Sequence, residues 1–211
     1  MRVIVIAKAP VPGRVKTRLC PPCTAVQAAA LAGAALEDTV EAAVDSGADE
    51  VVLALDGEAP AWMPRGIRKV AQRGRGLDER LAAAFDDAGA PALLVGMDTP
   101  QVSPGLLRRG FDELDAGDAV LGHAEDGGFW SVGLRRADRR VFRGVPMSTG
   151  STGVAQHRRL QALGLRVRVL PSLRDVDLID DARAVAAQAP GTRFAATLEA
   201  FGLSPSARRA S

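Results

Sequence analysis

The chain has 211 residues, enough for one α/β domain with a full hydrophobic core, whereas two complete domains would be cramped. A hydrophobic fraction of 47%, a charged fraction of 25% and a net charge of +2 are typical of an ordinary globular protein, and they argue against a nucleic-acid or membrane partner. No apolar run approaches the roughly 20 residues that span a bilayer, and no cleavable signal pattern opens the chain, so we expect a cytoplasmic protein.

Apolar and β-branched runs predict the strands. We expect buried strands in the run that begins at Val3, at 51–55 and at 92–95, a short strand near 67–70, and further strands at 118–122, 129–134 and 166–170.

Helices are predicted where apolar residues recur at helical spacing after a capping residue. Thr24 is a suitable N-cap for an alanine-rich helix running to about Asp45, and Ser103 followed by Pro104 opens another that runs to about 114. The remaining predicted helices are 77–88, 152–163, 180–189 and 193–201.

Strands and helices alternate through most of the chain, which predicts a single three-layer α/β/α domain with a mostly parallel sheet. The 129–134 strand suggests mixed character on one side. We expect the domain to cover residues 1–203 and residues 204–211, rich in Ser, Pro and Arg, to form a disordered tail.

A basic loop follows the first predicted strand. It contains prolines and a glycine, and its cations are Lys8, Arg14, Lys16 and Arg18. Only three of the 27 basic residues are lysines, and two of the three lie here. A strand followed by a basic Pro/Gly loop and a helix is an arrangement that presents phosphate-binding groups at the carboxyl end of a sheet.

Aspartates follow several predicted strands and should therefore meet the basic loop at one edge of the sheet. They are Asp56, Asp98, Asp175 and Asp177. Carboxylates opposite lysine and arginine suit a complex of a divalent metal with a triphosphate. Taken singly, each aspartate could equally be a helix cap or a turn residue.

Two glycine-rich segments have open interpretations. Asp126-Gly127-Gly128 is either a plain turn or a backbone that approaches a ligand closely, with Trp130 as a pocket wall or a core residue. The hydroxyl-rich stretch from Ser148 to Gly153 either cradles an anion or caps the following helix.

Other catalytic arrangements find no support. There is no GxxxxGK[ST], GxGxxG or GxSxG pattern, and neither His123 nor His157 has an evident nucleophile partner. Cys20 and Cys23 are interpreted as turn residues rather than a redox pair, and too few further ligands exist for a structural zinc site.

Four segments occur together in this order: Ala7–Leu19, Gly96-Met-Asp-Thr-Pro100, Asp126-Gly-Gly-Phe-Trp130 and Asp175-Val-Asp177. As a set they resemble a bacterial family of small GT-A-like proteins, DUF2064. Members of that family are often labelled as glycosyltransferases and are similar to 2-phospholactate guanylyltransferase and molybdenum cofactor guanylyltransferase. The resemblance covers about residues 1–190 and implies a nucleotide-diphospho-sugar transferase fold of Rossmann-like character.

The resemblance also implies roles for individual residues. Nucleotide and phosphate binding falls to Ala7, Lys8, Pro10, Gly13, Arg14, Lys16, Thr17, Arg18 and Gln72. Acceptor binding falls to Asp126, Gly127, Gly128, Ser148 and Thr149. Asp98 and Asp177 would hold Mg²⁺ or Mn²⁺, and Lys16, Arg18 and Asp98 would be catalytic.

These roles fit transfer of a nucleoside monophosphate group from a nucleoside triphosphate to a small phosphorylated acceptor, with release of pyrophosphate. The alternatives are glycosyl transfer from a nucleoside diphosphate sugar and nucleotide binding without catalysis. The positive charge of the loop favours a triphosphate over a diphosphate. The oligomeric state stays open, with a homodimer compatible.

Overall fold

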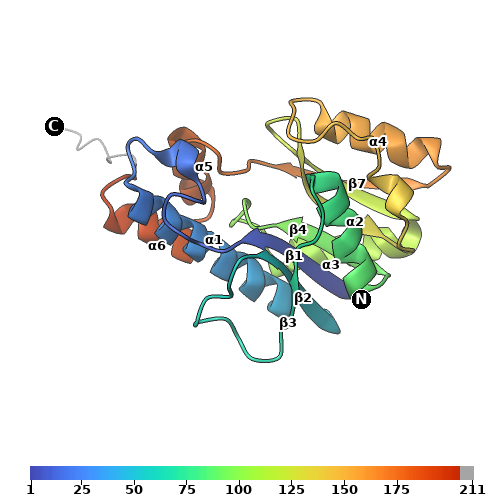
Figure 1. The fold of residues 1–211 in the computed structure, drawn as a ribbon, viewed down its shortest axis with the longest axis horizontal. Helices are drawn as coiled ribbons and strands as arrows, with labels where there is room; N and C mark the ends of the chain where they lie inside the picture. The colour runs from blue at the N-terminus through green and yellow to red at the C-terminus, as the bar shows by residue number, and fades with distance from the viewer. Residues whose placement is uncertain (205–211) are drawn as a thin grey trace.

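Seven strands form one sheet at the centre of the computed structural model, which describes residues 1–204 (Figure 1). They are β1 (Arg2–Lys8), β2 (Glu50–Asp56), β3 (Arg68–Ala71), β4 (Ala92–Gly96), β5 (Ala119–Ala124), β6 (Phe129–Leu134) and β7 (Val167–Leu173), in the order β3-β2-β1-β4-β6-β5-β7. β6 runs antiparallel to β4 and β5, and every other adjacent pair is parallel. The mixed, mostly parallel sheet is therefore confirmed.

β1 lies near the centre of the sheet because its side chains are apolar on both faces. Val3, Ile4 and Val5 are fully buried, as expected for a parallel strand covered by helices on both sides. β1 pairs with β2 from Arg2 opposite Glu50 to Lys8 opposite Asp56, and with β4 on its other edge. The carboxyl ends of these strands consequently meet at one edge of the sheet.

The helices α1 (Ala25–Asp45), α2 (Leu77–Ala88), α3 (Pro104–Ala116), α4 (Thr152–Ala162), α5 (Ile179–Gln188) and α6 (Arg193–Ala200) cover both faces of the sheet. α1 and α3 share one apolar cluster with the sheet, and α2 and α4 share another with its opposite face. α5 and α6 pack on the side of α1 that faces away from the sheet (Figure 1).

The predicted helix starts are confirmed. The Thr24 side chain accepts from Gln27 N, and the Gln27 side chain accepts from Thr24 N, so the two form a capping box. Ser103 accepts from Leu106 N, with proline in the first turn. Two 3-10 helices were not predicted, η1 (Thr17–Leu19) and η2 (Arg139–Val141).

Apart from Ser204, the predicted tail lies outside the described residues. Within residues 1–204, no helix combines the length and the apolar character that a bilayer crossing requires.

Candidate functional site

A cleft of about 520 Å³ opens at the carboxyl ends of β1 and β4. The basic loop after β1, the segment after β4, the β5–β6 turn, the residues before α4 and the segment after β7 surround it. Most of the predicted site residues line this cleft, namely Ala7, Lys8, Arg14, Lys16, Thr17, Arg18, Gln72, Asp98, Asp126, Gly128, Ser148, Thr149 and Asp177.

Three predicted site residues lie off the cleft wall. Pro10 packs against α1 beside Gly33. Gly13 has a φ of +77° and supplies the turn of the basic loop. Gly127 faces Gly150 in the neighbouring loop.

Lys16 is the central cation of the site. Its side chain is only 9% exposed, and its Nζ lies 2.6 Å from Asp98 Oδ1 and also donates to Val176 O. The backbone of Lys16 adopts the left-handed conformation, with φ 49° and ψ 36°, which is unfavourable for a residue with a Cβ. Such strain concentrates at functional positions, because the surrounding structure must hold it.

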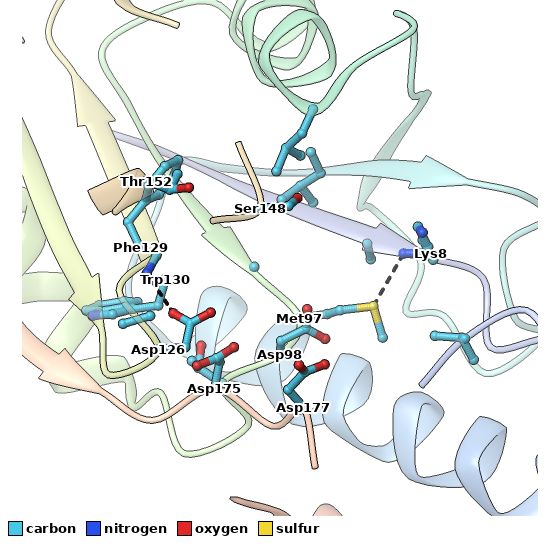
Figure 2. A pocket seen from close by; sticks show the side chains of 18 of the residues that line it. Lys8, Met97, Asp98, Asp126, Phe129, Trp130, Ser148, Thr152, Asp175 and Asp177 are labelled. Carbon is cyan, nitrogen blue, oxygen red and sulfur yellow. Dashed lines mark hydrogen bonds between the residues drawn. The ribbon is translucent and has the colours of Figure 1, made fainter. Parts of the chain in front are cut away.

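The basic loop is joined to the segment after β7. Arg18 pairs with Asp177, and Val176 N donates to Asp98 O at 2.8 Å. Figure 2 shows Asp98 and Asp177 on the same side of the cleft. The predicted meeting of the basic loop with Asp98 across one cleft is therefore confirmed.

Two further cations of the loop remain available to a ligand. Lys8 and Arg14 line the cleft, are exposed and form no ion pair with any of residues 1–204. Lys8 N donates to Met97 Sδ at 3.3 Å, which ties the end of β1 to the segment that carries Asp98 (Figure 2).

Gln72 bridges the ends of two strands. Its Nε2 donates to Ala7 O at 2.7 Å and to Ala54 O at 3.0 Å, while Arg80 Nη1 approaches its Oε1 at 3.4 Å. Arg80 also pairs with Asp56 at 2.9 Å. Asp56 ends β2 opposite Lys8, so it meets the basic loop at the sheet edge as expected. It does not line the cleft, however, and no pattern in the sequence indicated its partner Arg80.

Two further carboxylates of the cleft, those of Asp126 and Asp175, repel one another. Burial, together with the negative charges of Asp126 and Asp98, raises the pKa of Asp175 to about 6, although Lys16 opposes the shift. Neither Asp126 nor Asp175 forms an ion pair with any described residue. This part of the cleft therefore carries net negative charge.

The residues fit a metal bound jointly with phosphate. Within residues 1–204, no three His, Cys, Asp or Glu side chains form a complete protein site. Asp98 and Asp177 are, however, 52% and 43% exposed, and both line the cleft. Mg²⁺ characteristically takes one or two carboxylates and completes its shell with phosphate oxygens and water.

The glycines of the β5–β6 turn allow two loops to pack. A Cβ on Gly127 would collide with the Gly150 carbonyl, and Gly153 N donates to Gly127 O at 2.8 Å. Asp126 Oδ1 accepts from Gly128 N at 2.7 Å, which closes the turn. Close packing between protein loops, rather than close approach of a ligand, explains Gly127.

The hydroxyl-rich loop before α4 is held by hydrogen bonds among its own residues and Thr152. Thr152 Oγ1 accepts from Thr149 N at 3.0 Å and donates to Pro146 O at 2.8 Å. The backbone N–H of Thr152 donates to Thr149 O, and that of Gly153 to Gly127 O. Ser151, the residue before α4, makes no side-chain capping hydrogen bond, so these contacts hold the loop together but do not support capping by a side chain.

Trp130 is both a core residue and a cleft wall. It is 3% exposed, lines the cleft, and its Nε1 donates to Pro171 O at 3.0 Å. Its ring lies over Gly122, where a Cβ would clash. Sequence reasoning did not identify Gly122, because its partner comes from the neighbouring strand.

The cysteines form no disulfide, and Cys23 is buried beside α1 and α5. Burial, and then the neighbouring Cys20, raise the pKa of the Cys23 thiol, which disfavours a reactive thiolate. This agrees with their interpretation as turn residues.

One protein family matches the sequence of this chain. The family described as "Uncharacterized protein conserved in bacteria (DUF2064)" matches residues 28–149. Among curated proteins, none matches the chain.

Solved structures resemble most of the chain. A candidate nucleotide-diphospho-sugar transferase from Desulfovibrio desulfuricans G20 is 26% identical with a TM-score of 0.86, covering 96% of this chain and 95% of its own. Rv0371c of Mycobacterium tuberculosis H37Rv, in a complex with manganese, is 26% identical with a TM-score of 0.51. The match covers 87% of this chain and 96% of Rv0371c. A nucleotidyl transferase from Methanothermobacter, Mth528, is 18% identical with a TM-score of 0.60, covering 93% and 99%, and shows likeness of fold alone. The fold is that of the nucleotide-diphospho-sugar transferases.

Proposed function

The chain belongs to the DUF2064 family, and from that premise we propose that it is a divalent-metal-dependent nucleotidyltransferase, which moves a nucleoside monophosphate group from a nucleoside triphosphate to a small acceptor. The transferase fold of its structural neighbours supports this class of reaction.

The contact between Lys16 and Asp98 carries the proposal. A nearly buried lysine in a strained backbone conformation touches a partly exposed carboxylate at the end of β4, the strand beside β1. Burying a lysine costs free energy unless its charge is paired. Lys16 and Asp98 both line the cleft, as do the other cations of the basic loop. A metal–phosphate substrate suits this pair, because its phosphate would bind Lys16 and its metal would bind Asp98 in place of the ion pair.

In the proposed reaction an acceptor oxygen bonds to the α-phosphorus, the bond from that phosphorus to the β-phosphate oxygen breaks, and pyrophosphate leaves. Lys16 and Arg18 hold the β- and γ-phosphates and stabilise the charge that develops on the leaving group. Asp98 and Asp177 would hold Mg²⁺ or Mn²⁺, which when bound neutralises phosphate charge. Gln72 keeps the ends of β1 and β2 together beneath the nucleotide.

The number of available cations favours a triphosphate. Lys8 and Arg14 are unpaired among the described residues, and Lys16 and Arg18, which pair with Asp98 and Asp177, bring the number of loop cations to four. A nucleoside diphosphate sugar would present less charge to this loop, so glycosyl transfer at the same site ranks second. The manganese complex of Rv0371c agrees with metal binding in either case.

The nucleotide is tested by thermal unfolding with each nucleoside triphosphate and each nucleoside diphosphate sugar, with and without Mg²⁺ or Mn²⁺. A ligand at 100 times its dissociation constant adds about 2.7 kcal/mol to the unfolding free energy. We expect the largest shift with one triphosphate and metal. A larger shift with a nucleoside diphosphate sugar would favour glycosyl transfer instead.

Catalysis is tested with the Lys16→Ala variant, assayed as pyrophosphate release with the stabilising triphosphate and a cell extract as the source of acceptor. We expect activity to fall by roughly 10²-fold or more, because a preorganised charge at the leaving group is lost. Lys69→Ala is the matched control, since Lys69 is an exposed lysine of β3 outside the cleft. Undiminished activity in Lys16→Ala would refute the phosphate role, and binding that is indifferent to Asp98→Ala, without turnover, would indicate a non-catalytic nucleotide-binding protein.

A further inference from the structure

The two ends of the cleft carry opposite charge. At the loop end Lys8, Arg14, Lys16 and Arg18 line the wall, and the remaining lining cation, Arg80, is paired with Asp56 beside β2. At the other end, the charged side chains on the wall are Asp126 in the β5–β6 turn and Asp175 after β7, and Asp175 lies near enough to Lys16 and Asp98 to be affected by their charges. Among residues 1–204, no lysine, arginine or histidine lines that end.

Backbone groups do not compensate for the missing cations. A helix N-terminus can bind an anion through its free N–H groups. At the start of α4, however, Thr152 N donates to Thr149 O at 3.1 Å and Gly153 N donates to Gly127 O at 2.8 Å. Ser151 N approaches Thr149 Oγ1 at 3.4 Å. A phosphate placed here would therefore face two carboxylates, and the N–H groups of Thr152 and Gly153 would not be free to bind it.

The same end offers partners for hydroxyl groups. Asp126 uses one carboxylate oxygen on Gly128 N, which leaves its other oxygen to accept from a ligand. The Ser148 side chain, on a backbone with φ 58°, lines the wall and makes no hydrogen bond within the described residues. Phe129 and Trp130 add an aromatic surface to the same wall (Figure 2). Acceptor oxygens beside aromatic rings suit a compound that carries both hydroxyl and C–H groups.

We infer that the acceptor is a neutral polyhydroxy compound, a sugar or polyol whose bound portion carries no phosphate; this rests on the proposed nucleotidyl transfer. It departs from the sequence-based expectation of a phosphorylated acceptor, because the charge at this end of the cleft is visible only once the chain is folded. In the transfer, a hydroxyl oxygen of the acceptor bonds to the α-phosphorus, pyrophosphate leaves, and the hydroxyl proton passes to water.

The experiment compares matched neutral and phosphorylated probes, namely glucose with glucose 1-phosphate and glycerol with glycerol 3-phosphate. Binding is followed by the fluorescence of Trp130 in a full-length Trp62→Phe background, since Trp62 lies outside this cleft. Inorganic pyrophosphate and Mg²⁺ are present to occupy the loop cations. We expect at least one neutral probe to bind tenfold or more tightly than its phosphorylated partner.

Asp126→Asn tests the cause of this preference, because its amide oxygen can still accept from Gly128 N while the charge is removed. We expect the ratio between the dissociation constants of the phosphorylated and the neutral probe to fall by at least threefold. Glu125→Gln is the matched control, since the adjacent Glu125 is paired with Arg174 and does not line the cleft. An equal narrowing in both variants would overturn the inference.

The inference would also be overturned if every phosphorylated probe bound as tightly as its neutral partner or more tightly, or if no neutral probe bound. Tighter binding of ethanolamine, a cation, than of the neutral probes would overturn it as well. Failure of the nucleotide panel, by contrast, would remove the proposed transfer reaction while the preference among these probes could still be measured. The two failures are therefore distinguishable.

Discussion

Two residues show how the site is held in an unfavourable local geometry. Lys16 and Ser148 are the non-glycine residues with positive φ within the described chain, and both line the cleft. A left-handed backbone costs such residues roughly 1–2 kcal/mol, which packing elsewhere must offset. This coincidence of strain and cleft is an independent reason to regard the cleft as the functional site.

A residue-scale prediction concerns pH. His123 stacks on His157, with ring centroids 5.9 Å apart. Burial, and then the neighbouring His157, lower the pKa of His123 below its ordinary value of 6.5. The unfolded chain therefore binds this proton more readily, so we expect stability to fall as pH drops from 6.5 through the folded pKa, and to be unaffected by this group above 6.5.

Imidazole NMR titration checks the assignment of causes. Because burial is the larger cause, His123 should keep most of its lowered pKa in the His157→Gln variant, with only a partial return towards 6.5. A His123 that titrates at or above 6.5 in the wild-type protein would contradict the prediction.

At the scale of elements, Asp38 attaches α6 to α1. It is 7% exposed, and its two carboxylate oxygens accept from Arg193 N and Phe194 N, each at 2.9 Å. In Asp38→Ala both N–H groups lose their acceptor in a buried position, so we expect the unfolding free energy to fall by about 2–3 kcal/mol in urea denaturation.

The control for this prediction is Glu41→Ala. Glu41 also pairs with Arg193, but at the surface and without holding a backbone N–H. Its loss should cost less than about 1 kcal/mol. Similar losses in the two variants would show that the Arg193 ion pairs, and not the cap, attach α6.

The elements were largely predictable because their signals are local. Apolar runs and capping residues placed the helices and strands of the described chain to within a few residues. β7 runs on to Leu173, beyond the predicted end at 170, because Pro171 is tolerated in a strand at the sheet edge. The role of Asp38, in contrast, could not be predicted from a local pattern, because the N–H groups it binds lie about 155 positions further along the chain.

At the scale of the whole molecule, topology explains both the success and the limit of the site prediction. Parallel strands align their carboxyl ends, so the sequence correctly expected the basic loop and Asp98 to meet. Pairings between distant side chains, such as Arg80 with Asp56, follow no local pattern. The division of the cleft into a cationic and an acidic end likewise depends on which loops the fold brings together.

The last prediction concerns the two sides of the cleft acting together. Without ligand, the basic loop and the segment after β7 neutralise each other through Arg18 with Asp177 and Lys16 with Asp98. Phosphates would take the cations of these pairs and the metal would take the carboxylates. Nucleotide alone would leave the two carboxylates without a partner, and metal alone would leave the two cations without one. We therefore expect the thermal shift with nucleotide and metal together to exceed the sum of the separate shifts.

Metal also binds nucleotide in solution, so the decisive comparison is between variants. Asp177→Asn frees Arg18 in advance, which should strengthen binding of metal-free nucleotide and reduce the excess shift. Asp180→Asn is the matched control, because Asp180 pairs with Arg183 at the surface of α5, away from the cleft. An excess shift that is unchanged in Asp177→Asn would mean that the Arg18–Asp177 pair does not oppose ligand binding, and that the two sides of the cleft bind phosphate and metal independently.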